Sequence, residues 1–223
     1  MKLHRILTVA ALLLAVAAPG ARAETASYGL RLNIVNWEEN ELFGDESPDA
    51  SGVSIGPSML FRFGEGDEWS AGFEGFYGSM SDLDRADLDL TLGYSISSLF
   101  GVFLDMRYFW YDIEKGDAEA NNSGVGIGPG VQVSVPFGGS GLFFFANTRV
   151  IPMALSLDND EADESAVLWA YEGGLAIAIE PNTGVNDSNV YLALGYRHQQ
   201  MKGSDIDEKM QMPFLEAGFK QEF

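Results

Sequence analysis

Few residues of this chain have the types and spacing that catalysis needs. It has no cysteine and two histidines, of which only His198 lies beyond the first 23 residues. Gln199 and Gln200 follow it, and no serine or carboxylate beside it completes a nucleophile–base pair. Asp82 and Asp84 form a carboxylate pair, but no partner for acid–base catalysis is close in the sequence. We therefore predict a protein with neither enzymatic activity nor a cofactor.

Clustered carboxylates are the second candidate site. Oxygen ligands suit hard divalent cations, yet the run DNDEADE at 158–164 lacks the glycine and the terminal glutamate of a calcium loop. We expect a solvated acidic surface that holds Mg²⁺ or Ca²⁺ loosely, without a specific metal site. The carboxylates are Glu38, Glu39, Glu41, Asp45, Glu46 and Asp49 in one segment and Asp158, Asp160, Glu161, Asp163 and Glu164 in another.

The first 23 residues have the three parts of a secretory signal peptide. Lys2 and Arg5 make a positive start, residues 6–18 are apolar, and a small-x-small motif ends at Ala23. The 13 residues of the apolar part are fewer than the roughly 20 that span a bilayer as a helix. We expect cleavage after Ala23, which leaves residues 24–223 as one domain.

The charge of that domain excludes nucleic-acid partners. Three of the 13 basic residues lie in the signal peptide, so ten remain against 33 acidic residues, a net charge of −23. Such a surface repels a phosphate backbone. The mean hydropathy of −0.01 fits either a periplasmic protein or a membrane barrel, in which alternating strands average out.

Ten runs of alternating polarity indicate β-strands. One run, for example, places Leu88 and Leu90 on one face and Asp87 and Asp89 on the other. Polar, mostly acidic connectors alternate strictly with mostly short ones that contain Gly, Pro or Asn, as an up-and-down barrel requires. The runs are residues 27–37, 52–63, 69–80, 87–98, 101–112, 122–135, 142–154, 166–180, 189–200 and 210–223.

We therefore predict an all-β fold, a single-chain antiparallel up-and-down transmembrane β-barrel with ten strands, or alternatively eight. A soluble sandwich would also alternate, with its apolar faces turned inward. Aromatic residues near both ends of the runs favour the barrel, which has two aromatic belts. These residues are Trp37, Tyr77, Trp110 and Trp169 at the loop ends and Tyr28, Phe63, Trp69, Phe137 and Phe219 at the turn ends.

The C-terminal run MPFLEAGFKQEF resembles the last strand of bacterial outer-membrane β-barrel proteins. It alternates and ends on Phe223, as this family typically does, but departs from the pattern at Gln221, where an apolar or aromatic residue is usual. The resemblance implies a monomer in the outer membrane, among its lipids and lipopolysaccharide. It also implies that Phe219 and Phe223 form an assembly signal, with periplasmic chaperones and the barrel-insertion machinery as transient partners.

Two enzyme families of that membrane offer a further comparison. Omptin proteases, which are ten-stranded barrels, use one Asp-x-Asp pair and one Asp-His pair at the outer rim. Asp82 and Asp84 resemble the first pair, but no aspartate accompanies His198. Lipid A deacylases use a histidine with a serine two residues on, and Gln200 occupies that place here. The alternation puts His198 on the lipid face at the outer interface, as an interfacial aromatic residue.

Charged residues on the face opposite the apolar one are predicted to line the lumen. Facing lipid near the midplane would cost them about 2–4 kcal/mol each. We expect an Arg/Glu network and four phenylalanines, Phe103, Phe109, Phe143 and Phe145, to fill a narrow interior, and we assign Asp87 and Asp89 to the rim. The predicted lumen residues are Arg31, Arg62, Glu74, Asp105, Arg107, Arg149, Glu172, Arg197, Glu216 and Lys220.

The function predicted from these features is a non-enzymatic role in the cell envelope or in surface interaction, through acidic extracellular loops. The first alternative is a narrow, porin-like passive diffusion channel that slightly prefers anions. The third possibility is a hydrolase at the outer rim.

Overall fold

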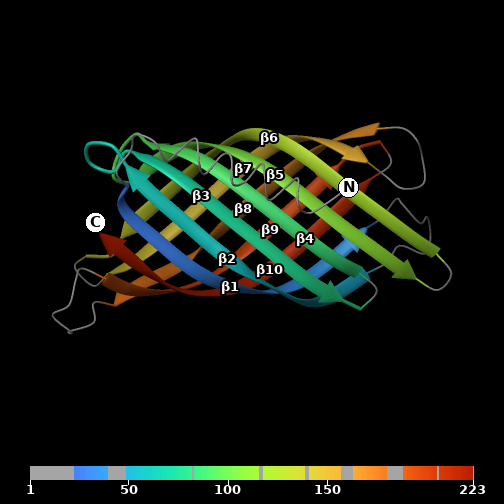
Figure 1. Cartoon of the computed structure of the whole chain (residues 1–223), viewed down its shortest axis with the longest axis horizontal. Coiled ribbons are helices and arrows are strands. Elements are labelled where there is room, and N and C mark those ends of the chain that lie inside the picture. The colour runs from blue at the N-terminus through green and yellow to red at the C-terminus, as the bar shows by residue number, and fades with distance from the viewer. Residues whose placement is uncertain are drawn as a thin grey trace.

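The computed structural model describes residues 23–39, 49–81, 83–115, 118–138, 141–156, 163–179, 188–204 and 206–222. Ten strands follow in chain order, each antiparallel to the next, and β1 also pairs with β10, so the sheet closes into a barrel (Figure 1). This confirms the all-β, ten-stranded up-and-down fold. The strands are β1 Ala23–Glu39, β2 Asp49–Phe63, β3 Trp69–Met80, β4 Leu83–Ser95, β5 Phe100–Lys115, β6 Ala118–Pro136, β7 Leu142–Ser156, β8 Asp163–Ile179, β9 Ser188–Lys202 and β10 Asp207–Glu222.

The two ends of the barrel differ in their connections. One end carries the tight connections, such as residues 64–68, and is called the turn side below; the other carries the connections that we predicted as acidic loops and is called the loop side. Among the described residues, no helix is long and apolar enough to cross a membrane.

The fourth strand shows where the predicted boundaries were wrong. Residues 96–98 were expected to continue it, but the backbone N–H groups of Ile96 and Ser97 donate to the carbonyl oxygen of Phe100, at 2.9 and 3.0 Å, and close a turn. At its other end β4 begins at Leu83, inside a predicted connector. Other strands also extend further toward the loop side than expected, and this extension determines what lies inside the barrel.

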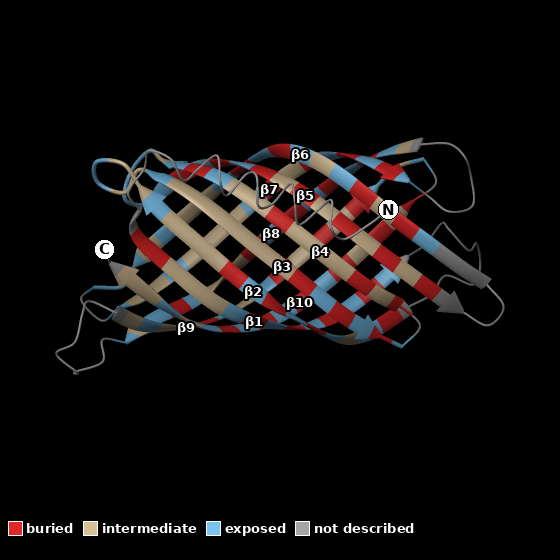
Figure 2. Ribbon diagram, viewed as in Figure 1, coloured by how far each residue is buried: buried red, intermediate tan, exposed pale blue. Residues whose placement is uncertain are grey.

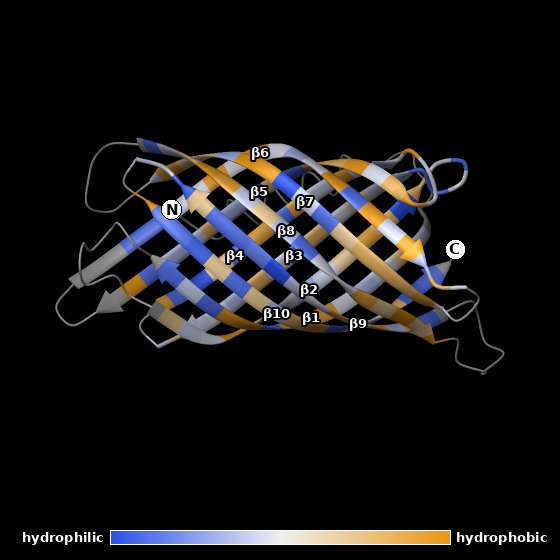
Figure 3. Ribbon diagram, turned by 180° about the vertical axis from the view of Figure 1, so that it is seen from behind, coloured by the Kyte–Doolittle hydropathy of each residue, from blue (hydrophilic) through white to orange (hydrophobic). Residues whose placement is uncertain are grey.

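Buried and exposed residues alternate along much of the barrel wall, and polar and apolar residues follow one another along the ribbons (Figure 3). On β9 the outward residues Leu192 and Leu194 are 41% and 66% exposed, whereas Arg197 points inward and is 1% exposed. A band of exposed apolar side chains of this kind surrounds the barrel, and a bilayer is the surroundings in which such a band is stable.

Prolines interrupt two of the ladders. Pairing between β2 and β3 skips Gly56 and Pro57, and pairing between β6 and β7 skips residues 127–129. A proline has no N–H to donate to a ladder. At both places the glycine before the proline, Gly56 or Gly128, lies so close to the next strand that a Cβ atom would overlap a backbone carbonyl. Glycine is required there by this close approach.

Candidate functional site in the barrel interior

Five arginines and seven carboxylates form one connected set of ion pairs in the interior, which we call the arginine network. Arg197 is at its centre. Its Nε donates to Glu172 at 2.5 Å, its Nη1 lies 3.5 Å from Asp89, and its Nη2 donates to Glu74. The members are Arg31, Arg85, Arg107, Arg149 and Arg197 with Glu74, Asp87, Asp89, Asp105, Glu172, Glu208 and Glu216.

Strand register places many of these partners side by side. Arg197 of β9 is directly opposite Glu172 of β8, and Arg31 of β1 is opposite Glu216 of β10. Opposed side chains on neighbouring strands are about 5 Å apart, within reach of an ion pair. The contact between Arg197 and Asp89 is of another kind, because β9 and β4 lie on opposite sides of the barrel. It crosses the lumen.

The network is buried, and its formal charges do not balance. Glu74 has the most exposed side chain in it, at 22%, while Asp105 and Arg107 are fully buried. The guanidinium of Arg31 also lies over the ring of Phe214, 4.1 Å from its centre. Buried ions are costly unless they are paired, so each arginine that contacts several carboxylates holds them in place. Seven carboxylates against five guanidinium groups leave the carboxylates in excess.

Eight of the ten predicted lumen residues belong to the arginine network, and two do not. Arg62 is exposed at the turn side of β2, and Lys220 is half-buried at the same side of β10. The eight are Arg31, Glu74, Asp105, Arg107, Arg149, Glu172, Arg197 and Glu216.

Four members of the network were missed or misplaced by the sequence analysis. The assignment of Asp87 and Asp89 to the rim was wrong, because β4 continues to Leu83 and carries both inside, where Arg107 contacts each of them. Arg85 and Glu208 lie in segments predicted as connectors, yet they pair at 2.5 Å. Extending the alternation of each run into the adjoining polar segment would have found them.

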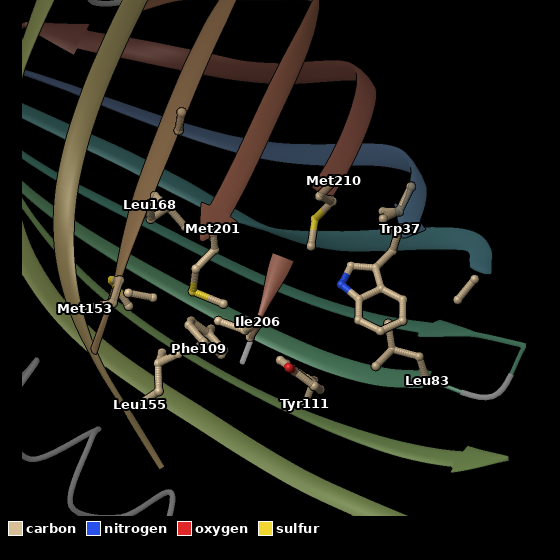
Figure 4. Packing of buried hydrophobic residues seen from close by; sticks show 14 of the residues in the cluster. Trp37, Leu83, Phe109, Tyr111, Met153, Leu155, Leu168, Met201, Ile206 and Met210 are labelled. Carbon is tan, nitrogen blue, oxygen red and sulfur yellow. The ribbon is translucent and has the colours of Figure 1, made fainter. Parts of the chain in front are cut away.

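An apolar cluster fills the interior on the loop side of the network (Figure 4). The ring of Trp37 meets that of Tyr111 edge-on at 5.9 Å, and Phe109 stacks on Tyr111 at 5.7 Å. Ile206, between β9 and β10, is fully buried over them. The cluster comprises Val35, Trp37, Ala50, Met80, Leu83, Phe109, Tyr111, Ile113, Ile151, Met153, Leu155, Ala166, Leu168, Ala170, Met201, Ile206, Met210 and Met212.

This cluster corrects two expectations about aromatic residues. Trp37 was assigned to the outward belt, but it lies on the same face of β1 as Arg31 and is 1% exposed. Of the four phenylalanines expected to fill the lumen, Phe103 and Phe109 are buried, while Phe143 and Phe145 are half-buried toward the turn side.

Little space remains where the network meets the cluster. A cavity of about 10 Å³ lies there, lined by residues of both, with Ser54 and Gln199 among its walls. It has room for about one water molecule. At this level the interior is filled by side chains.

The polarity of the barrel wall inverts toward the loop side. On β9 the outward residues change from Leu194 to Gln200 and Lys202, while the inward residues change from Arg197 to Met201. Buried positions, red in Figure 2, accordingly alternate with exposed ones toward the loop side, whereas intermediate positions dominate the turn side. An apolar interior with a polar exterior is the pattern of a barrel in water, so the loop-side rim extends beyond the apolar band.

The other predicted residues do not form a site together. His198 faces outward and stacks on Tyr171 at 4.8 Å, while Asp84 lies on β4, across the barrel. Phe219 faces outward at the turn side, 47% exposed, with its ring 5.1 Å from that of Tyr28. Ala23 is the first residue of β1. Asp82, Phe223, residues 40–48 and residues 157–162 lie outside the described residues.

Comparison with solved structures identifies the fold. The outer membrane protease OmpT from Escherichia coli is 9% identical, and the match covers 92% of this chain and 99% of that one with a TM-score of 0.54. Two further structures match. The beta domain of the Bordetella autotransporter BrkA is 13% identical, and the match covers 88% of this chain and 99% of that one with a TM-score of 0.48. Neisserial surface protein A is 15% identical, and the match covers 92% of this chain and 100% of that one with a TM-score of 0.43. No protein-family model and no curated protein matches the sequence. The chain has the fold of bacterial outer-membrane β-barrels.

Proposed function

We propose that this chain is a non-enzymatic outer-membrane barrel with a closed lumen, which presents its loop side at the cell surface for envelope or surface interactions. The observation that carries the proposal is the filled interior. The arginine network joins opposite walls of the barrel, and the apolar cluster covers it on the loop side. A diffusion channel needs a continuous wet path, and these two layers occupy its place.

The inverted polarity of the rim supports this orientation. Outward carboxylates such as Glu38, Asp84 and Asp112 lie on the loop-side parts of their strands, beyond the apolar band. Such a rim is stable in water. A surface of this charge suits partners with basic groups or bridging divalent cations.

Cysteine labelling tests the orientation, because the chain has no cysteine of its own. Ser81→Cys, exposed on the loop side between β3 and β4, should react with a membrane-impermeant maleimide in intact cells. Glu65→Cys, exposed in the turn between β2 and β3, is the matched control and should react only after the outer membrane is permeabilised. Labelling of Glu65→Cys in intact cells, with Ser81→Cys protected, would reverse the orientation and contradict the proposal.

The assembly signal gives a separate prediction. Deletion of Phe223 should lower the amount of barrel in outer-membrane fractions several-fold, because the terminal aromatic residue is proposed to be read during insertion. Phe223→Tyr, which keeps an aromatic ring, is the control and should assemble normally. Immunoblots of fractionated cells provide the measurement, and equal levels of the truncated and full-length proteins would refute this role of Phe223.

A further inference from the structure

A basic and aromatic patch lies on the outward face of β8, β9 and β10 near the loop side. It consists of Trp169, Tyr171, His198, Lys202 and Lys209 and is called the β8–β10 patch below. We propose that this patch binds the phosphate groups of lipid A, the glycolipid of the outer leaflet. The inference rests on the membrane orientation proposed above and adds a binding site to it.

Register brings the two lysines together. Lys202 is opposite Asp207, two residues before Lys209 on β10, so the lysines are diagonal neighbours on the same face of the sheet. Diagonal neighbours are about 7–8 Å apart, within reach of long side chains. Both ammonium groups can therefore approach one anion or two neighbouring anions.

Depth in the membrane follows from strand geometry. Ten residues along β8 separate Trp169 from Ile179, which shares a row with Val190 and Phe219 at the turn side. At about 3.4 Å per residue and a tilt of about 45°, these rows are about 24 Å apart along the barrel axis. The apolar band of a membrane barrel is about 25 Å tall. Lys209 and Phe219 are likewise ten residues apart on β10, so with Phe219 at one boundary of this band Lys209 lies at the other, where phosphate headgroups are found.

The surroundings of the patch suit an amphiphilic anion. Trp169 and Tyr171 are 57% and 52% exposed, as aromatic side chains at the headgroup level are. Below them Leu194 and Leu215, 66% and 52% exposed, provide an apolar wall for acyl chains. One ligand can therefore contact the lysines with its phosphate and the leucines with its hydrocarbon.

The distribution of charge also favours this position. Five arginines are paired with carboxylates in the arginine network inside the barrel, and Arg62 and Lys220 lie at the turn side. Among the side chains that the structure describes, Lys202 and Lys209 are the basic ones on the outward face near the loop side. Lys202 is 63% exposed, and its ion pair with Asp207 is long, at 3.6 Å.

Two carboxylates face these lysines. Glu38 lies opposite Lys209, and Asp207 lies opposite Lys202. Because the Lys202 side chain is exposed and its ion pair with Asp207 is long, a phosphate can replace Asp207 at the ammonium group. A lipid with two phosphates matches two lysines on adjacent strands better than a lipid with one.

Titration of the refolded, full mature barrel with bisphosphorylated lipid A, followed by native mass spectrometry from detergent micelles, tests the proposal. Wild type should bind it, and Lys202→Gln/Lys209→Gln should need at least tenfold more lipid for half-saturation. Arg62→Gln, which removes an exposed basic residue at the turn side, should bind as wild type does. Heat-modifiability on gels verifies that every variant is folded.

Two lipid controls identify the chemistry. Dephosphorylated lipid A should bind wild type at least tenfold more weakly, and phosphatidylglycerol should not reproduce the dependence on the two lysines. Equal half-saturation of wild type and the double variant would overturn the site. Binding of phosphatidylglycerol with the same lysine dependence would overturn the assignment to lipid A. Cysteine labelling tests the orientation independently, so a failed lipid site leaves that result unaffected.

Discussion

Arg197→Gln should lower the free energy of unfolding of the refolded barrel by about 3–5 kcal/mol, the usual cost of breaking a buried ion pair by removing one partner. Arg197 contacts Glu74, Asp89 and Glu172, and its loss removes one counter-ion from each of them. Seven buried carboxylates then face four arginines instead of five. Denaturant titration in detergent micelles measures the change. The control Arg62→Gln removes the same group from an exposed position and should change the free energy by less than about 0.5 kcal/mol.

The excess of carboxylates makes this prediction asymmetric. Glu172→Gln removes one negative charge from a set that has too many, and both of its arginine partners keep other carboxylates. It should therefore destabilise the barrel less than Arg197→Gln does. If Glu172→Gln costs as much as Arg197→Gln, the predicted asymmetry is contradicted. If Arg197→Gln costs no more than Arg62→Gln, the network contributes no such stability and the interior is open to water.

Trp37→Ala should cost about 3–5 kcal/mol, as large-to-small substitutions of buried aromatic residues do. Trp37 is 1% exposed in the apolar cluster, and its removal leaves a cavity beside Tyr111. Trp169→Ala is the matched control, because Trp169 is 57% exposed on the outer face. In detergent micelles it should shift the unfolding midpoint less. Equal shifts for the two variants would contradict a packed core inside the rim.

Alternation alone was sufficient to predict much of the interior. In the sequence, Arg31, Arg107 and Arg197 each lie on the strand face opposite to the apolar residues. Because side chains alternate between the two faces of a strand, these arginines point inward when the apolar residues face lipid. The count of ten strands followed similarly, from the strict alternation of two kinds of connector. These predictions needed local information only.

Trp37 and Asp89 show what the sequence analysis missed. Each run was read as ending where its outward residues became polar, but that change marks the edge of the apolar band and not the end of the strand. The strand continues into water with its polarity inverted, so Trp37 lies inside, and Asp89 lies below the rim. The pairing of Asp89 with Arg197 also depends on closure of the barrel, which no local pattern specifies.

Unitary conductance in planar bilayers tests the closed lumen most directly. Refolded wild-type barrel, with folding verified by heat-modifiability, should show no steady openings whose size scales with salt concentration, because the arginine network and the apolar cluster fill its interior. A reproducible unitary conductance would contradict the closed lumen and establish a diffusion channel. The ion selectivity of that channel would then identify the charges at its constriction, with anion preference indicating the arginines and cation preference the acidic loops.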